Sequence, residues 1–352
     1  MKHKVGIIGC GRPGHGQARG HVKGWQEAGC EVVALCDIVP DNAAALRDAF
    51  GLEGARLYTD THELLAREEL DFLSICLWPH LHAPVVEAAA QAQVRAIHCE
   101  KPVAPHYGDA VRMVEACRER GVQLTFNHQR RFLRQFMEAK RLLDEGAIGE
   151  LESMEAHCPD LFDWGTHWFD QMLGFNNQTP VSWVLGQVDW REAINIFGVP
   201  IERLGTAYFQ CENGVTGLLV GSRAEGAWNG VFVRLNGTKG ALEIGQTRTG
   251  KNHQLRLLND ANGWRDLNVP GEDAGDDPYS RVMQDLVRAL ETGEPSLLDA
   301  RNALQATELI FAAYESARKQ ERVFVPLEGV TKHPLLEILR AHDALPPGLR
   351  IE

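Results

Sequence analysis

The sequence predicts two domains, a doubly wound α/β domain followed by an α+β domain with a large, mainly antiparallel sheet. Over the first 126 residues, short apolar runs alternate with helical patterns, which is typical of a parallel sheet covered by helices on both faces. Beyond that point, alternating strands separated by glycine turns predict an antiparallel sheet. The chain has 352 residues, which allows two domains at about 150 residues each.

Five runs in the first part are predicted as strands, because each is short, bounded and rich in Val, Ile, Leu or Phe. They cover residues 4–8, 31–36, 71–77, 94–99 and 122–126. Helical patterns lie between them, at residues 42–49, 60–67, 83–91 and 109–120. Asp60 and Glu63 are spaced as in a capping box, which predicts where the second of these helices begins.

The pattern changes after residue 126. A helix is predicted at 131–145, and strands with alternating apolar residues follow, as at 207–212 and 231–235. Glycine turns separate the strands, at Asn213-Gly214, Asn236-Gly237 and Lys239-Gly240. Two more helices are predicted at 278–291 and 299–320. These patterns divide the chain into a first domain at 1–126, a second at 127–328 and a tail at 329–352.

Charge and cysteine content exclude several classes of protein. The net charge is −12, and an acidic surface repels nucleic acid and anionic membranes. No apolar run reaches the roughly 18 residues of a membrane span, and the N-terminus leads into a strand rather than a signal peptide. These features predict a cytoplasmic protein. The eight cysteines form no C-x-x-C pair and are expected to be reduced thiols in that compartment.

A glycine motif follows the first predicted strand. Gly9-Cys10-Gly11-Arg12-Pro13-Gly14 has the spacing G-x-G-x-x-G, and the pattern predicts that it opens a helix. Gly9 allows a tight turn, Gly11 lets the backbone approach a pyrophosphate, and Gly14 is expected to allow close packing of helix on strand. The N–H groups at the helix start then face the phosphates. This context predicts a Rossmann dinucleotide-binding domain.

Asp37 ends the second predicted strand, about 20 residues beyond the glycines, where a carboxylate accepts hydrogen bonds from ribose hydroxyls. It would repel a 2′-phosphate, and the next residue is Ile38 rather than an arginine that would hold that phosphate. The sequence therefore predicts NAD in preference to NADP.

Four further motifs carry a resemblance to a known family. They are Glu100-Lys101-Pro102, Trp78-Pro79-His80-Leu81-His82, Asp163-Trp164-Gly165-Thr166-His167 and Gly237-Thr238-Lys239-Gly240. Together with the glycine motif, they make residues 4–326 resemble the Gfo/Idh/MocA oxidoreductases, the family of glucose–fructose oxidoreductase and inositol dehydrogenase. Trp78 and His80 stand where that family usually has Thr and Asn.

The resemblance implies a hydride transfer between a nicotinamide cofactor and a hydroxyl carbon of a sugar, a sugar derivative or a cyclitol. It implies Lys101, Asp163 and His167 as the catalytic group and no metal. The predicted cofactor-binding residues share the carboxyl ends of the strands. They are Gly9, Gly11, Arg12, Pro13, Gly14, Asp37, Trp78, Pro79, His82, Glu100 and Lys101.

The residue types suit this chemistry. Pro102 favours an extended Lys101, so that the amine projects from the sheet edge. Asp163 and His167 are four residues apart, which in a helix places them on one face, and Asp170 continues that face. His167 can take a hydroxyl proton because imidazole titrates near neutral pH. Glu100 is expected to orient the loop or pair with Lys101.

For some residues the sequence allows both a functional and a structural role. His82 is expected to cap or pack in its helix rather than contact substrate. Arg130 and Arg131 could hold a carboxylate or phosphate of the substrate, or serve as surface residues. Tryptophans are concentrated in the second domain, where they line a sugar pocket or fill the core; they are Trp164, Trp168, Trp183, Trp190 and Trp228.

Alternative functions are an NAD-dependent glycosidase that oxidises its sugar transiently, a non-catalytic NAD-binding regulator, and a metal-dependent alcohol dehydrogenase. The intact Glu100-Lys101-Pro102 argues against the regulator. His80, His82, His98 and Cys99 lack the spacing of common zinc sites. By analogy with the family, the antiparallel sheet is expected to form a homodimer or homotetramer interface.

Overall fold

The computed structural model describes residues 2–224, 230–246, 253–259, 263–269 and 277–351. Two compact units divide the chain, and each contains two separate segments. The first unit is Met1–Gln129 with Pro278–Leu304, and the second is Arg130–Asp277 with Gln305–Glu352. Within the described residues, no helix is long and apolar enough to span a membrane.

The first unit is built on a six-stranded sheet with the order β3-β2-β1-β4-β5-β6, in which every pairing is parallel. Its strands are β1 (Lys4–Ile8), β2 (Glu31–Cys36), β3 (Arg56–Tyr58), β4 (Phe72–Ile75), β5 (Ala96–Cys99) and β6 (Gln123–Phe126). The helices between them are α1 (Ala18–Glu27), α2 (Pro40–Ala49), α3 (Thr61–Arg67), α4 (His82–Gln91) and α5 (Tyr107–Arg120), with a 3-10 turn η1 (Pro79–Leu81). The predicted Rossmann topology is confirmed.

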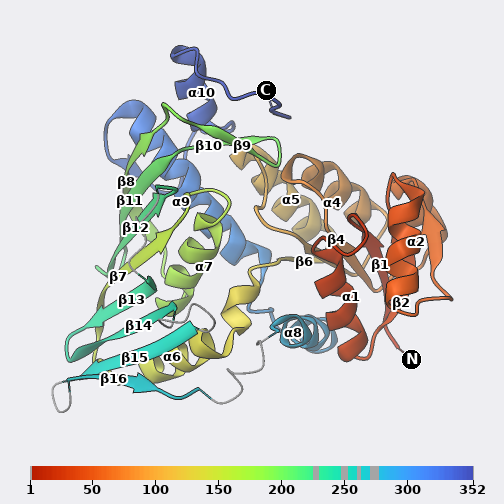
Figure 1. Ribbon diagram of the computed structural model, residues 1–352, viewed down its shortest axis with the longest axis horizontal. Helices are drawn as coiled ribbons and strands as arrows, with labels where there is room; N and C mark the ends of the chain where they lie inside the picture. The colour runs from red at the N-terminus through yellow and green to blue at the C-terminus, as the bar shows by residue number, and fades with distance from the viewer. Residues whose placement is uncertain (1, 225–229, 247–252, 260–262, 270–276, 352) are drawn as a thin grey trace. The chain divides into compact units, whose positions relative to one another are not determined.

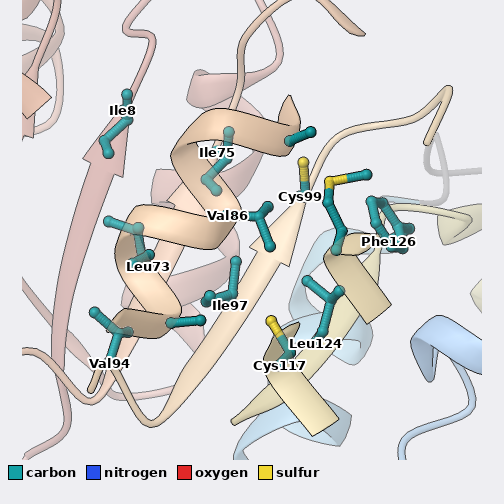
Figure 2. Packing of buried hydrophobic residues seen from close by; sticks show 14 of the residues in the cluster. Ile8, Leu73, Ile75, Val86, Val94, Ile97, Cys99, Cys117, Leu124 and Phe126 are labelled. Atoms are coloured by element: carbon teal, nitrogen blue, oxygen red, sulfur yellow. The ribbon is translucent and has the colours of Figure 1, made fainter. Parts of the chain in front are cut away.

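The core of this unit lies where β4 and β5 meet α4 and α5. All four residues of β4 and of β5 are buried, as expected for strands covered on both faces. Val86 of α4 and Cys117 of α5 pack with Leu73, Ile97 and the other residues drawn in Figure 2. At α3, Asp60 accepts a hydrogen bond from the Glu63 backbone N–H, as the capping pattern predicts.

A segment from late in the sequence completes the first unit. Helix α8 (Tyr279–Thr292) packs on α1, beside which it lies in Figure 1. The contact depends on two glycines of α1, because a Cβ on Gly20 would lie 2.6 Å from the Tyr279 ring and one on Gly24 would lie 2.8 Å from the Tyr279 carbonyl oxygen. The start of α9 (Ala300–Lys319) adds Ala300 and Ala303 to the core.

The second unit contains a nine-stranded sheet with the order β16-β15-β14-β13-β7-β12-β11-β8-β17. Its strands are β7 (Leu151–Cys158), β8 (Val181–Asp189), β11 (Leu204–Cys211), β12 (Thr216–Ser222), β13 (Val231–Gly237), β14 (Gly240–Gln246), β15 (His253–Asn259), β16 (Gly263–Leu267) and β17 (Val323–Phe324). The pairings are antiparallel except for β12 with β7. The mainly antiparallel sheet is therefore confirmed.

Helices cover one face of this sheet. Helix α6 (Arg134–Asp144) packs on β14 and β15, and α7 (Gly165–Phe175) packs on β7 and β12. Helix α9 lies so close to β8 that a Cβ on Gly186 would meet the Ala313 carbonyl oxygen at 2.2 Å.

The opposite face of the sheet carries exposed apolar side chains. Leu185, Tyr208 and Phe324 are 44%, 39% and 63% exposed. Tyr208 pairs with Leu185 across the strands, and Phe324 pairs with Trp183, whose ring lies 5.6 Å from that of Tyr208. These four residues form one apolar patch, called the sheet patch below.

The tail folds onto the second unit. Its helix α10 (Pro334–Ala341) contacts β10 (Val199–Ile201), which pairs with β9 (Ile194–Ile196) in a hairpin. The ring of His342 stacks on Trp190 with centroids 4.1 Å apart, and the Arg350 backbone N–H donates to the Gly198 carbonyl. The tail is thus an ordered part of this unit.

Candidate active site

Three of the predicted motifs follow strands that are neighbours in the first sheet. The glycine turn follows β1, the Trp78-Pro79 segment follows β4, and Glu100-Lys101 follows β5. The turns are also hydrogen-bonded to the neighbouring strands, since the Glu100 backbone N–H donates to the Ile75 carbonyl at 2.9 Å. The carboxyl edge of the sheet therefore gathers the predicted cofactor residues, as it does in open α/β sheets.

The glycine turn has the backbone of a dinucleotide cradle. Gly9, Gly11 and Gly14 all have positive φ, between 70° and 86°. A Cβ on Gly9 would lie 2.5 Å from the Cys76 carbonyl oxygen, and one on Gly11 would lie 2.8 Å from the His15 carbonyl oxygen. Both contacts are with backbone, which cannot move aside cheaply, so this close path requires glycine. Arg12 and Pro13, at the tip of the turn, are exposed.

Two predictions about this turn are wrong. The glycine motif does not itself open the helix, since α1 begins at Ala18, beyond Gly14 and Gly16, whose φ values of 79° and 102° no right-handed helix can contain. Gly14 also does not serve close packing, since a Cβ there would meet nothing within 4 Å. Close packing instead requires small residues at Gly20 and Gly24, in the first two turns of α1, where this helix contacts α8.

Asp37 follows β2 and its carboxylate is held in place. The Cys10 backbone N–H donates to Oδ2 at 2.9 Å, which ties Asp37 to the glycine turn. The Val39 backbone N–H and the Asn42 side chain donate to Oδ1 at 2.9 and 3.1 Å. A carboxylate fixed beside a glycine turn is the arrangement that binds the ribose of a dinucleotide, so these residues fit the cofactor that the fold implies.

A buried polar network lies behind Lys101. The Glu100 carboxylate is 4% exposed, and its Oε1 accepts hydrogen bonds from His21 at 3.0 Å and Asn127 at 2.7 Å. Its Oε2 accepts the Lys101 backbone N–H at 3.1 Å. Burial alone would raise the pKa of Glu100, but the hydrogen bond from His21 and the other donors hold it at about 2. Glu100 is therefore a carboxylate that orients the Lys101 backbone.

His82 and Trp78 differ in exposure. His82 is fully buried, and its two ring nitrogens lie 3.0 Å from the carbonyl oxygens of Leu77 and Val103. It therefore joins the loop after β4 to the loop after β5, and burial lowers its pKa. Trp78 is 49% exposed in extended backbone just before η1, and Pro79 begins that turn.

Asp163 and His167 lie at the start of α7, but not as predicted. The helix begins at Gly165, so Asp163 belongs to the turn before it and does not share a helix face with His167. Asp160 builds this turn by accepting hydrogen bonds on Oδ1 from the backbone N–H groups of Asp163 at 2.6 Å and Trp164 at 3.0 Å. Both predicted catalytic side chains are more than nine-tenths buried, at 8% and 3% exposed.

A second buried cluster supports this turn. Asp160 forms a salt bridge with Arg223, and Glu202 accepts the Leu161 backbone N–H at 2.6 Å and the Tyr314 hydroxyl. Burial raises the pKa of Glu202 to about 7, and the nearby Asp160 contributes to the same shift. Sequence reasoning missed this cluster, because its members come from distant parts of the chain and carry no common motif.

The two adjacent arginines have different environments. Arg131 donates from Nε to Asp170 Oδ2 at 2.6 Å and from Nη2 to Oδ1 at 2.9 Å, and both side chains are largely buried. A Cβ on Gly174 would meet this guanidinium at 2.7 Å, so that glycine makes room for it. Arg131 is therefore structural, and Asp170 is its partner rather than an extension of a catalytic face. Arg130 instead lies over the rings of Trp164 and Trp168.

The other tryptophans lie away from this turn or cannot be placed. Trp183 belongs to the sheet patch and Trp190 to the contact with the tail, whereas Trp228 lies outside the described residues. In the described ranges, no group of three or more His, Cys, Asp or Glu side chains is arranged to hold a metal ion.

Comparison with known proteins assigns both parts of the chain to one oxidoreductase family. Residues 3–128 match the family model described as "Oxidoreductase family, NAD-binding Rossmann fold". Residues 152–325 match the model described as "Oxidoreductase family, C-terminal alpha/beta domain".

Individual relatives match over part of their length. The chain is 40% identical to D-apiose dehydrogenase of Paraburkholderia graminis over 149 residues, which is 42% of this chain and 38% of that protein. It is 35% identical to inositol 2-dehydrogenase of Salmonella typhimurium over 153 residues, 43% of this chain and 44% of that protein. These matches thus span about two fifths of either relative.

Solved structures share the fold over nearly the whole chain. A levoglucosan dehydrogenase in complex with NADH and levoglucosan has a TM-score of 0.79 at 20% identity, covering 93% of this chain and 100% of that one. An Agrobacterium radiobacter oxidoreductase in complex with NAD+, L-tartaric acid and magnesium has a TM-score of 0.78 at 22% identity, covering 92% and 98%. With its two domains matched in order by the two family models, the chain belongs to the Gfo/Idh/MocA oxidoreductase family.

Proposed function

We propose that the protein is an NAD-dependent oxidoreductase that transfers a hydride between the cofactor and a hydroxyl carbon of a sugar, a sugar derivative or a cyclitol. The observation that carries the proposal is the Lys101 loop, which follows β5 at the same edge of the sheet as the glycine turn and is anchored by a buried carboxylate. Dehydrogenases for apiose and inositol among the relatives support the substrate class.

In this proposal each residue has one task. The nicotinamide ring, when bound, accepts or supplies the hydride. His167 takes the hydroxyl proton, and Lys101 stabilises the developing negative charge on the oxygen. Asp163 hydrogen-bonds a hydroxyl of the substrate. Glu100 and His82 act indirectly, because both are buried and hold the loops that carry Lys101 and Trp78. Lys101 belongs to the first unit and the other two to the second, so their joint action is part of the proposal.

The direct test is the formation of NADH, followed by absorbance, with NAD and a panel of sugars, sugar acids and inositols. We expect turnover with at least one class of these alcohols. A protein that binds NAD and produces no NADH with any of them, but cleaves an aryl glycoside, would instead be a glycosidase that uses NAD transiently.

We also propose that Asp37 makes NAD the preferred cofactor. Its three hydrogen bonds fix the carboxylate, so a 2′-phosphate would meet a negative charge that cannot swing away. We expect Asp37→Ser to raise the ratio of kcat/KM for NADP to that for NAD by roughly 10- to 100-fold, because one charged hydrogen-bonding group is lost. Steady-state kinetics with both cofactors measures this ratio.

Asp41→Ser is the matched control, since Asp41 is an exposed acid in the first turn of α2. Its cofactor ratio should equal that of the wild type. An Asp37→Ser protein with an unchanged ratio would show that selectivity resides elsewhere.

The sheet patch supports the proposal that the protein is a homodimer or homotetramer. Large apolar side chains on an open sheet face are typical of an interface between protein copies. Light scattering at micromolar protein should therefore give a mass above that of one chain.

The eight free cysteines, seven of them buried, support the further proposal of a reducing, cytoplasmic location.

A further inference from the structure

The guanidinium of Arg130 lies over two aromatic rings. This residue lies in the 3-10 turn η2 (Gln129–Phe132), and its Cζ is 5.1 Å from the ring centroid of Trp164 and 5.0 Å from that of Trp168. Aromatic faces attract a guanidinium and shield it from water, but they leave its N–H groups without acceptors. The two rings therefore hold the cation in position without accepting hydrogen bonds from its N–H groups.

No carboxylate of the described chain neutralises this cation. Its Nε is buried and has no hydrogen-bond partner within the part of the chain that the structure describes. Burial lowers the pKa of Arg130 to about 10, and among the described residues no acidic group opposes that shift. Arg131 and Arg223 are different, because each has its own buried aspartate, Asp170 and Asp160. A partly buried guanidinium without an anion is unfavourable, which is a reason to expect the anion from a ligand.

The place of Arg130 connects it to the proposed substrate site. Trp164 directly follows Asp163, and Trp168 directly follows His167, so both stacking partners are chain neighbours of the residues proposed to contact the substrate. All of them belong to the second unit. The guanidinium of Arg130 can therefore bind a second group of a substrate that contacts Asp163 and His167.

We propose that Arg130 binds a carboxylate of the substrate, so that the substrate is a sugar acid such as an aldonate or a uronate; this inference rests on the proposed function. A planar guanidinium pairs with a carboxylate through two parallel N–H···O bonds. The single positive charge of Arg130, which no described carboxylate balances, also matches the single negative charge of a carboxylate. A phosphate dianion would need a second cation, and the neighbouring Arg131 is already neutralised by Asp170.

The test compares acids with neutral counterparts of the same carbon skeleton. Isothermal titration calorimetry on the protein saturated with NAD would measure binding of D-gluconate against D-glucitol, D-galactonate against galactitol, and D-glucuronate against D-glucose. At least one acid is expected to bind at least tenfold more tightly than its counterpart. Glucose 6-phosphate and inorganic phosphate are included to identify a phosphate site.

Three variants locate the effect. Arg130→Met should weaken binding of the acid by roughly 10- to 100-fold, as expected for loss of a charged hydrogen bond, and leave the neutral counterpart within about twofold. Arg130→Lys, which keeps the charge but not the fork, should fall between Arg130→Met and the wild type. Arg191→Met is the control, because Arg191 is 77% exposed and pairs only with the adjacent surface Asp189 among the described residues.

The outcomes separate this inference from the proposed function. Tighter binding of a phosphate than of every acid, equal weakening of acid and neutral ligand in Arg130→Met, or binding of none of the acids would overturn it. If NADH forms with a neutral sugar that Arg130→Met turns over normally, the inference fails and the proposed function stands. If an acid binds through Arg130 but no NADH forms, the carboxylate site stands and the proposed function fails. Thermal melting of each variant shows whether it is folded.

Discussion

Replacing Lys101 by methionine should lower kcat by at least about a thousandfold. The substitution keeps the length of the side chain but removes its charge and its proton, which the proposed reaction needs at the oxygen that gains negative charge. The Glu100 carboxylate contacts the Lys101 backbone N–H, so the loop keeps its anchor in the variant. Single-turnover absorbance measurements with NAD and the active substrate would report the hydride step directly.

Two comparisons make the Lys101 result interpretable. Lys23→Met removes an exposed lysine of α1, 48% exposed and paired with Glu27, and should leave kcat unchanged. The dissociation constant for NAD, measured by fluorescence titration, should change less than about threefold in Lys101→Met. Retention of full turnover by that variant would refute the role assigned to Lys101.

Replacing Asp170 by alanine should lower the free energy of unfolding of the second unit by about 3–5 kcal/mol. Asp170 is 1% exposed and Arg131 is 11% exposed, so removal of the carboxylate leaves a buried guanidinium without its counter-ion. Urea denaturation followed by tryptophan fluorescence is a suitable measurement, because Trp164 and Trp168 lie in the same turn and helix.

Asp144→Ala serves as the control for this loss. Asp144 is about half exposed on α6 and pairs with Lys140 at the surface, where a salt bridge contributes at most about 1 kcal/mol. The double variant Asp170→Leu/Arg131→Met should regain part of the lost stability, because no charge then remains buried. An Asp170→Ala protein as stable as the control would show that solvent reaches Arg131.

Local patterns predicted the first unit well where strands are buried on both faces. β1 and β2 have the predicted bounds, since their apolar runs end at a glycine turn and at an aspartate. β3 was not predicted, because it has three residues and two of them are exposed. Helix α1 starts beyond the glycine motif that was expected to open it, since the sequence does not show which glycines adopt positive φ.

The local geometry around the candidate catalytic residues was not predicted. The i,i+4 spacing of Asp163 and His167 predicted one helix face, whereas hydrogen bonds to the Asp160 carboxylate build a separate turn there. Nothing in the pair Arg130-Arg131 distinguishes the two residues. Only the tertiary contacts with Asp170 and with the two tryptophans do so. Pairings between residues far apart in the chain leave no local signal.

Because α8 and the start of α9 belong to the first unit, their late position in the sequence determines when that unit can complete its folding. During synthesis, residues 1–129 leave the ribosome first, but the glycine face of α1 stays uncovered until Tyr279 is made. Ala300 and Ala303 reach the core later still. The nucleotide-binding half therefore finishes folding only after the whole large sheet except its edge strand β17 has been translated. A fragment ending at residue 129 would expose apolar surface, whereas a fragment of residues 1–129 joined by a linker to 278–304 retains the complete first unit.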